Sequence, residues 1–430
     1  MNSTLRIALR NLLRQKARYR VLGVAIAFGC AIITIVYGAL GGMRMSLEEK
    51  AKIYYGGDFS VFGSTKNGAL SVDNPREVVD ALEALPGKPV RAALRIDYRS
   101  NVFLSFGGNS VHMRMVMGAA FDREERNFRS FNYVAGGPEG MRGSNGVLIS
   151  APVAKMLGAR VGDDILLLID TTTGQRNSAT LVLRGIYRDS SLFGFYTSYM
   201  DIDFLRAVTR LDPVSTTYVG GYYQGNGRLM FPLRRIQAAL EKKLPMFPLA
   251  AAKADMFAIH DRSNWAGVKY SLIGLGAHIA QINQVVEVMT ILLLALACLL
   301  MGTVVLGVVN TYRVIVYERT KEIGTMRAIG MQRPMVIRLF LLEAGILAVG
   351  TSALGVAIGI GALALLSAVN LSWLPGFDVF LSNGRIAWVM APGEMLLVAS
   401  LMLAAVLAAA AGPASRAASI EPVQACSMES

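Results

Sequence analysis

Residues 318–330 combine closely spaced charges of both signs with small and apolar residues, in the order Glu-Arg-Thr-Lys-Glu-Ile-Gly-Thr-Met-Arg-Ala-Ile-Gly. Glu318 and Glu322 are one helical turn apart, so they share a helix face. This dense block of charge lies between two long uncharged apolar runs, and charge in a bilayer core is costly. We therefore interpret it as a short loop between membrane helices that contacts another surface; a solvated connector is the alternative.

The same stretch carries signals for a helix, a bend and a second helix. Ile323, Met326 and Ile329 form an apolar strip on the first helix. Gly330 suits the position just after a helix end, and Pro334 suits the first turn of the next helix. A helix this short cannot stand alone in water, so we expect it to pack on the bilayer surface or on a partner.

Glu343 stands at the inner edge of the following apolar run. A carboxylate in this position is often functional. It can equally pair with Arg338 or Arg327 and fix the bend, and we favour that structural role.

Four runs without charge predict four membrane spans. The chain has 430 residues, of which 53% are hydrophobic. Each run reaches the roughly 20 residues that a helix needs to cross a bilayer. The first run is longer than a signal-peptide core and no small-x-small cleavage site follows it, so we expect a retained anchor. The runs are 21–43, 288–312, 344–377 and 395–415.

The net charge is +13, and the positions of the basic residues indicate the membrane topology. Basic residues precede the first run, fill the loop over 313–338 and follow the fourth run at Arg416. The positive-inside rule then puts both termini and this loop in the cytoplasm, and the segment from about 44 to 283 outside. That segment has no cysteine, so its own core must hold it together.

The outer segment shows mixed signals that predict an α+β domain. Strands are expected over 147–149, 165–169 and 181–187. Helices are expected over 75–85, over 151–157 with a stop at Gly158, and up to Thr209 from a cap at Asp201 or Asp203. From Ser271 onward the apolar periodicity runs unbroken into the second span, which predicts a helical stalk.

Two glycine pairs have the spacing that lets helix backbones approach closely. They are Gly38 with Gly42, and Gly355 with Gly359. We expect them at helix contacts, with a contact between subunits as one interpretation.

The chain contains no phosphate-binding loop, no dinucleotide fingerprint and no metal-ligand spacing among its histidines and cysteines. We predict a non-catalytic chain without a cofactor of its own and without affinity for nucleic acid. A membrane-anchored enzyme with its active site in residues 44–283 is disfavoured.

The chain resembles the FtsX-like permease family, which includes MacB-type exporters and lipoprotein-releasing permeases. The family motif E-R-x-x-E-I-G-x-x-R-A-x-G matches residues 318–330, and Phe340-Leu341-Leu342-Glu343-Ala344 matches the start of its third span. Arg10-Asn11-Leu12-Leu13-Arg14 resembles the family's start and residues 413–425 its closing pattern. Ser415 and Cys426 stand where the family usually has basic residues, while residues 60–145 and 211–265 match nothing we can identify.

The resemblance implies a permease subunit that couples a separate ATPase, which holds ATP and Mg²⁺, to movement of an outer domain. The implied substrate is a lipoprotein, lipid, peptide or drug, and the implied location is a bacterial inner membrane. A second permease chain is expected, with a homodimer favoured over a heterodimer; membrane lipid and an outer adaptor or lipoprotein carrier are further partners. A signalling or scaffold protein that controls a cell-wall hydrolase is the alternative function. The implied ATPase-coupling residues are Glu318, Arg319, Glu322, Ile323, Gly324, Met326, Arg327, Ala328 and Gly330, with Pro334 and Glu343 shaping the bend.

The predicted divisions follow from these assignments. They are an interfacial helix over 1–20, membrane helices over 21–43, 284–312, 339–369 and 394–415, an α+β domain with a helical stalk over 44–283, a coupling loop over 313–338, an outer loop over 370–393 and a cytoplasmic tail over 416–430.

Overall fold

The computed structural model describes residues 6, 8, 10–12, 16–66, 70–189, 193–262, 264–371, 380–382 and 384–419. The chain divides into a helical unit and a sheet unit. The helical unit comprises 1–43, 287–370 and 385–430, and the sheet unit comprises 44–286 and 371–384. The boundaries fall inside two long helices, α2 and α11.

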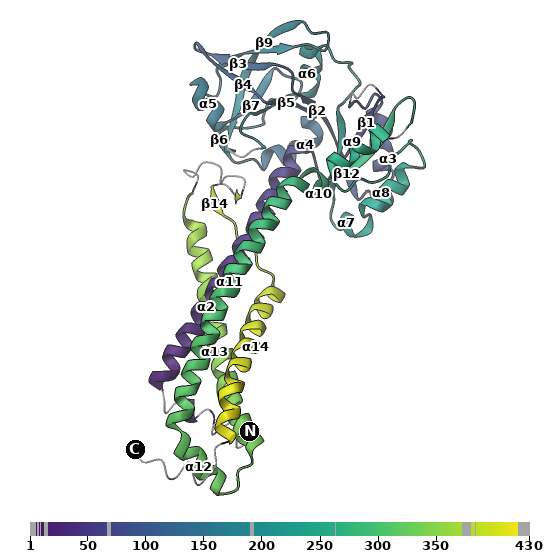
Figure 1. Cartoon of the computed structure of the whole chain (residues 1–430). Helices are drawn as coiled ribbons and strands as arrows, with labels where there is room; N and C mark the ends of the chain where they lie inside the picture. The colour runs from purple at the N-terminus through teal and green to yellow at the C-terminus, as the bar shows by residue number, and fades with distance from the viewer. Residues whose placement is uncertain are drawn as a thin grey trace. The chain divides into compact units, whose positions relative to one another are not determined.

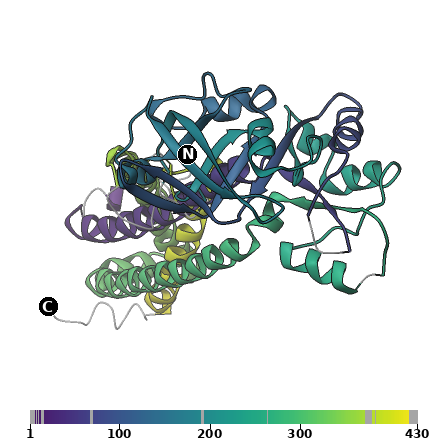
Figure 2. The same ribbon diagram turned by 90° about the horizontal axis from the view of Figure 1, so that it is seen from above.

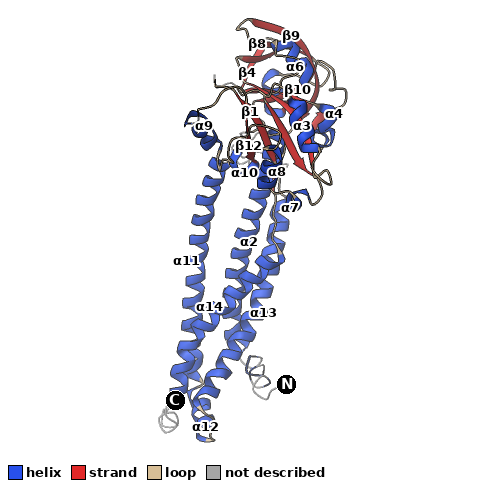
Figure 3. Cartoon of the chain, turned by 90° about the vertical axis from the view of Figure 1, so that its right-hand side faces the viewer, coloured by secondary structure: helices blue, strands red, loops and turns tan. Residues whose placement is uncertain are grey.

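Four helices are long and apolar enough to cross a membrane. They are α2 (Lys16–Tyr54), α11 (Ala280–Glu318), α13 (Arg333–Ala368) and α14 (Pro392–Ser419). The short helix α12 (Thr320–Ala328) lies between α11 and α13, at the turn of the bundle in Figures 1 and 3. The expected fold class, four apolar helices with an α+β region between the first two, is confirmed.

The helices are longer than the predicted spans. α2 continues past Met43 to Tyr54, and α11 begins at Ala280 and ends only at Glu318. Charged helix ends contribute nothing to an apolar run, so the sequence pattern marks only the part of each helix that is free of charge.

Close backbone approach between α2 and α13 shapes the interior of the helical unit. A side-chain carbon added to Gly355 would lie 2.8 Å from Cys30 Cβ, and one added to Gly359 would lie 2.7 Å from Thr34 Cβ. Gly38 meets Leu363 in the same way, and Gly42 meets the backbone at Ala387 and Trp388. Gly38, Gly355 and Gly359 therefore pack against other helices of the same chain. A contact between subunits at these glycines stays a prediction.

The sheet unit is built on one twelve-stranded sheet. Its strands follow the order β12-β1-β11-β2-β5-β10-β7-β9-β8-β3-β4, with β6 paired to β9. The bounds are β1 Phe59–Ser64, β2 Val90–Tyr98, β3 Val102–Phe106, β4 Asn109–Met113, β5 Met115–Ala119, β6 Tyr133–Gly136, β7 Gly146–Ser150, β8 Asp164–Asp170, β9 Arg176–Tyr187, β10 Thr197–Asp201, β11 Tyr218–Tyr223 and β12 Lys269–Gly274.

Short helices cover this sheet, and apolar side chains are buried between these helices and the strands. Figure 2 shows the helices of residues 227–262 gathered on one side of the unit. The bounds are α3 Pro75–Glu83, α4 Phe121–Arg129, α5 Ala151–Leu157, α6 Ile202–Thr209, α7 Gly227–Met230, α8 Leu233–Leu240, α9 Lys253–Arg262 and α10 Leu275–His278; a small ladder joins β13 (Leu381–Ser382) to β14 (Arg385–Ile386).

Several predicted elements of the sheet unit are present with their predicted caps. α5 ends at Gly158, whose φ is +73°, a left-handed conformation that glycine adopts without strain. α6 begins after Asp201, whose carboxylate accepts a hydrogen bond from the Asp203 amide at 3.0 Å. The predicted outward continuation of the second-span helix to Ser271 was wrong. Residues 269–274 form β12, which pairs antiparallel with β1, and the next helix begins at Leu275. A short apolar run is compatible with a buried strand and with a buried helix segment, and pairing with β1 makes this one a strand.

Some predicted ranges fall partly outside the described residues. Of the expected interfacial helix over 1–20, residues 6, 8 and 10–12 are helical and residues 16–20 belong to α2; the others lie outside the described residues. Residues 416–419 of the expected tail belong to α14, and residues 420–430 lie outside. The same holds for 372–379 and 383 in the expected outer loop.

Candidate functional site

The charged block of residues 318–330 forms the end of one helix and the whole of the next. α11 ends at Glu318, Arg319 adopts a non-helical ψ of 11°, and α12 begins at Thr320. The Thr320 hydroxyl donates to the carbonyls of Val316 at 3.1 Å and Tyr317 at 2.7 Å. These bonds satisfy carbonyls of the last turn of α11, so hydrogen bonds within the chain stabilise the break between α11 and α12.

Gly330 closes α12 with a Schellman motif. Its φ is +105°, and its amide donates to the Arg327 carbonyl at 3.0 Å. The Met331 amide donates to the Met326 carbonyl, also at 3.0 Å. These two bonds are the pair that defines the motif, and the positive φ explains why glycine occupies the position. Pro334 lies in the first turn of α13, as predicted.

Arg319 and Glu343 form a buried ion pair behind α12. Nη1 of Arg319 lies 2.9 Å and 3.1 Å from the two carboxylate oxygens of Glu343. The Glu343 side chain is fully buried and that of Arg319 is 4% exposed. The described partner of Glu343 is thus Arg319, and the predicted pairing with Arg338 or Arg327 was wrong. The structural role that we favoured for Glu343 stays a prediction.

Two polar groups from the start of the chain complete the surroundings of this carboxylate. The Asn11 side-chain amide donates to Oε1 of Glu343 at 2.7 Å, and the Tyr19 hydroxyl donates to Oε2 at 3.0 Å. The ring of Phe340 lies under the Arg319 guanidinium, 5.2 Å from its central carbon. A buried charge pair is tolerated when its remaining hydrogen-bonding capacity is satisfied in this way.

Arg319 also reaches the surface of α12. Its Nε lies 3.0 Å from Oε2 of Glu322, whose side chain is 53% exposed. One guanidinium thus joins a buried carboxylate of α13 to a half-exposed carboxylate of α12. We call the set Asn11, Tyr19, Arg319, Glu322 and Glu343 the arginine network.

The apolar strip predicted on α12 divides between core and surface. Ile323 is buried and Met326 is half-buried against the core of the helical unit, but Ile329 is 84% exposed. Residues three apart drift by about 60° around a 3.6-residue helix, so Ile329 lies about 120° away from Ile323. Gly324 is buried with Ile323, and α12 contacts α14.

The exposed face of α12 and its flanks combines charge with apolar side chains. Tyr317, which precedes Ile329 in the chain, is 75% exposed, and Met335, which follows it, is 48% exposed. Glu318, Lys321 and Ala328 are also exposed, while Arg327 is half-buried. We call Tyr317, Glu318, Lys321, Glu322, Ile329 and Met335 the α12 surface. Of the predicted coupling residues, Glu318, Glu322, Ala328 and Gly330 are on the exposed side, whereas Arg319, Ile323 and Gly324 are buried behind it.

Sequence reasoning missed the contributions of Asn11, Tyr19 and Phe340 to this site. Asn11 and Phe340 each belong to a quoted motif, so a signal existed for their importance but not for their contact. Among the residues that the structure describes, no group of three or more histidine, cysteine or acidic side chains could hold a metal ion.

Comparison with known proteins agrees with this geometry. Residues 294–422 match the family described as FtsX-like permease C-terminal, a range that contains α12, most of α11 and all of α13. This part of the chain is similar to FtsX-like permease domains. The match begins at residue 294, so it includes Arg319, Glu322 and Glu343 but not Asn11 and Tyr19.

Proteins with similar sequences match about a third of the chain. The "uncharacterized ABC transporter permease YknZ" of Bacillus subtilis is 30% identical over 162 residues, which are 37% of each chain. The "macrolide export ATP-binding/permease protein MacB" of Bdellovibrio bacteriovorus is 31% identical over 150 residues, 34% of this chain and 21% of the relative. The matched segment thus spans well under half the length of these relatives.

A comparison with solved structures gives a further similarity. The periplasmic region of MacB from Actinobacillus actinomycetemcomitans covers 54% of this chain and 94% of its own, with a TM-score of 0.33 and 9% identity.

Proposed function

We propose that this chain is the permease subunit of an ABC transporter and that a separate ATPase subunit docks on the α12 surface. The observation that carries the proposal is the exposed Ile329 among charged side chains, on a short helix whose other face is buried. An exposed apolar side chain rimmed by charge is the kind of surface that protein partners cover. The names of two relatives, an ABC transporter permease and an ATP-binding/permease protein, support the choice of partner.

In this proposal the arginine network transmits a displacement of α12 to the neighbouring helices. Arg319 is bound to Glu322 of α12 and to Glu343 of α13, and Glu343 is bound to Tyr19 of α2. A displacement of α12 therefore pulls on the inner ends of two other helices. α11 is continuous over 39 residues, about 58 Å at 1.5 Å per residue, so it can carry such a displacement along its length.

In this proposal both termini and α12 face the cytoplasm and the sheet unit lies outside, as the positions of the basic residues favour. ATP and Mg²⁺ are bound by the ATPase. Two permease chains assemble, preferably as a homodimer, and the machine moves a lipoprotein, lipid, peptide or drug by transmitting motion to the sheet unit; an outer adaptor or lipoprotein carrier completes the path.

Purification from native membranes in lipid, followed by native mass measurement, tests the proposal. We expect two copies of the permease with an ATPase of ABC type, and no ATP turnover by the permease chain alone. Recovery of the chain without any nucleotide-binding subunit, or ATP hydrolysis by the isolated chain, would overturn it.

A further inference from the structure

The sheet unit contains a cavity of about 830 Å³ that the proposed mechanism does not use. Its walls come from β2, α9 and α10 and from Tyr55 at the end of α2. Aromatic and aliphatic side chains make up most of these walls: Tyr55, Phe62, Leu70, Ile96, Leu211 and Phe257. The volume lies within the range of ordinary small-molecule sites, which are largely apolar with a few placed polar groups.

Lys253 supplies a positive charge to this cavity. Its ammonium lies 5.1 Å from the centre of the Phe62 ring, and within the described part of the chain no acidic side chain forms an ion pair with it. Burial lowers the pKa of Lys253 below its usual value. Asp97 and Arg99 also act on this ammonium, with opposite signs. An ammonium that is partly removed from water beside an aromatic ring gains from an anion brought to it.

The cavity's carboxylate is already neutralised by a neighbour. Asp97 accepts two hydrogen bonds from Arg99, from Nε at 2.9 Å and from Nη2 at 2.7 Å. This bidentate pair is the strong geometry for arginine and a carboxylate. With Asp97 and Arg99 balanced, the formal charge that remains on the wall is that of Lys253.

His278 adds a neutral aromatic surface. Its ring stacks on Tyr55 with centres 4.2 Å apart, and its Nε2 lies 3.3 Å from the Ser60 hydroxyl. Burial, and secondarily the nearby charge of Lys253, lowers the pKa of His278 to about 3. The imidazole is therefore uncharged near neutral pH and does not compete with Lys253 for an anion.

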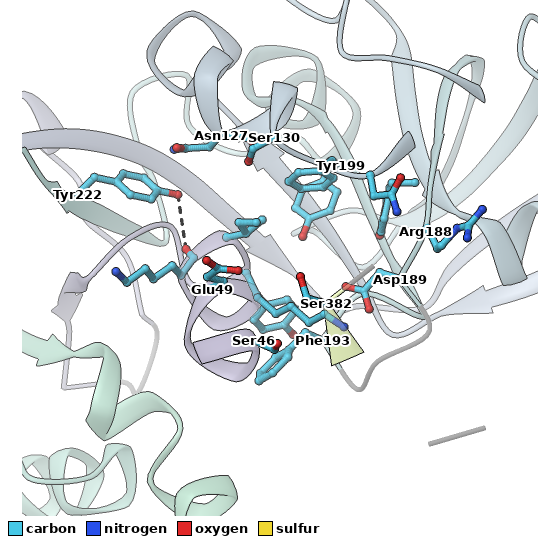
Figure 4. Close-up of a pocket in the computed structure, with 17 residues that line it drawn as sticks. Ser46, Glu49, Asn127, Ser130, Arg188, Asp189, Phe193, Tyr199, Tyr222 and Ser382 are labelled. Carbon is cyan, nitrogen blue, oxygen red and sulfur yellow. Dashed lines mark hydrogen bonds between the residues drawn. The ribbon is translucent and has the colours of Figure 1, made fainter. Parts of the chain in front are cut away.

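A second cavity of the sheet unit shows the contrast. It has a volume of about 390 Å³, and Figure 4 shows Glu49, Arg188 and Asp189 around it together with Tyr199 and Tyr222. Two acidic side chains, Glu49 and Asp189, and three basic ones, Lys50, Lys52 and Arg188, border the same hollow. The larger cavity has fewer charges in its lining: Asp97 pairs with Arg99, and Lys253 lies beside the Phe62 ring.

We propose that the larger cavity binds an organic carboxylate with an aromatic or apolar body. The carboxylate pairs with the Lys253 ammonium, and the body covers Phe62, Phe257 and the Tyr55–His278 stack. This site is independent of the α12 surface, so either proposal can fail without the other.

Calorimetric titration of the full chain in nanodiscs tests this site. The probes are 2-naphthoate and its neutral analogue 2-naphthamide, which share the aromatic body. Because a hydrogen bond to a charged group contributes about 1.5–3 kcal/mol, we expect the wild type to bind the carboxylate at least about tenfold more tightly than the amide. Lys253→Met should abolish this preference, and Lys253→Arg should retain it.

Lys243 offers a matched control, because it is an exposed lysine of the same unit. Lys243→Met should leave the preference unchanged, and amine acylation followed by mass spectrometry should show that 2-naphthoate protects Lys253 but not Lys243. Equal affinity for the two probes, binding of neither, or an unchanged preference in a folded Lys253→Met variant would overturn the proposal.

Discussion

The helical unit and the sheet unit each contain a buried arginine–glutamate pair, and the two pairs differ in their connection to the surface. In the sheet unit, Arg95 and Glu124 are both buried, with Nη2 and Oε2 2.6 Å apart. In the helical unit, Arg319 lies 2.9 Å from buried Glu343 but also binds half-exposed Glu322. One pair is closed within its core; the other has a branch that reaches the surface.

The immediate surroundings of the two pairs are otherwise alike. Each glutamate accepts a hydrogen bond from a tyrosine hydroxyl, and each guanidinium lies over a phenylalanine ring. The groups are Tyr222 at 3.1 Å and Phe128 at 5.1 Å in the sheet unit, and Tyr19 at 3.0 Å and Phe340 at 5.2 Å in the helical unit. Similar chemistry thus occurs in two settings: the closed pair lies within a core, and the branched pair links the α12 surface to helices behind it.

Removal of the arginine from the closed pair should have the largest effect on stability. Arg95→Met leaves Glu124 buried without a cation, which costs about 3–5 kcal/mol. Denaturant unfolding and protease resistance of the sheet unit would measure this loss. Arg99→Met, at an ion pair whose arginine is 56% exposed, is the control and should cost about 1 kcal/mol or less. An Arg95→Met protein as stable as the control would show that the closed pair contributes nothing.

Replacement of both partners should separate the two pairs. Replacing a buried ion pair by apolar residues is often neutral or stabilising, so Arg95→Met with Glu124→Leu should regain most of the lost stability and keep substrate-stimulated ATPase activity in the assembled complex. Arg319→Met with Glu343→Leu should also fold, but it should lose most of that stimulation because Glu322 no longer has its link to α13. Equal ATPase stimulation in the two double variants would contradict the proposed difference between the pairs.

A substitution at Gly330 should act on the same link with a smaller energetic cost. A β-branched residue at a φ of +105° is strained, by about 1–3 kcal/mol. Gly330→Val should therefore misplace the turn after α12 while every charge stays present, so that the ATPase still binds but its activity is uncoupled from transport. Gly393→Val, on a helix start with open space around it, is the control. Normal coupling in Gly330→Val would show that the turn is not needed.

The parts of the site that follow local rules could be predicted from the sequence. Gly330 predicts a helix end and Pro334 predicts a helix start, because few other residues suit those backbone positions. In the same way Gly158 and Asp201 marked the bounds of two helices in the sheet unit.

The contacts of the site depend on distances along the chain that local spacing does not encode. Glu343 is 24 residues from Arg319 and 324 residues from Tyr19. Which of several nearby arginines it meets depends on how α12 turns against α13, and two of the candidates were wrongly preferred. The apolar run at 269–274 became a strand because β1 was available to pair with it. Burial of Arg319 could not be predicted for the same reason: its partners Glu322 and Glu343 lie on two different helices.

The central claim is that an ATPase docks on the α12 surface, and pull-down of that subunit from membranes tests it most directly. Glu322→Lys places a cation where the surface has a carboxylate, and Ile329→Asp places a charge at its apolar centre; either should lower association at least about tenfold. Lys242→Glu, an exposed charge reversal on the sheet unit, should leave association unchanged. If folded Glu322→Lys and Ile329→Asp proteins both retain the ATPase at the level of this control, α12 is a solvated connector and the account is wrong.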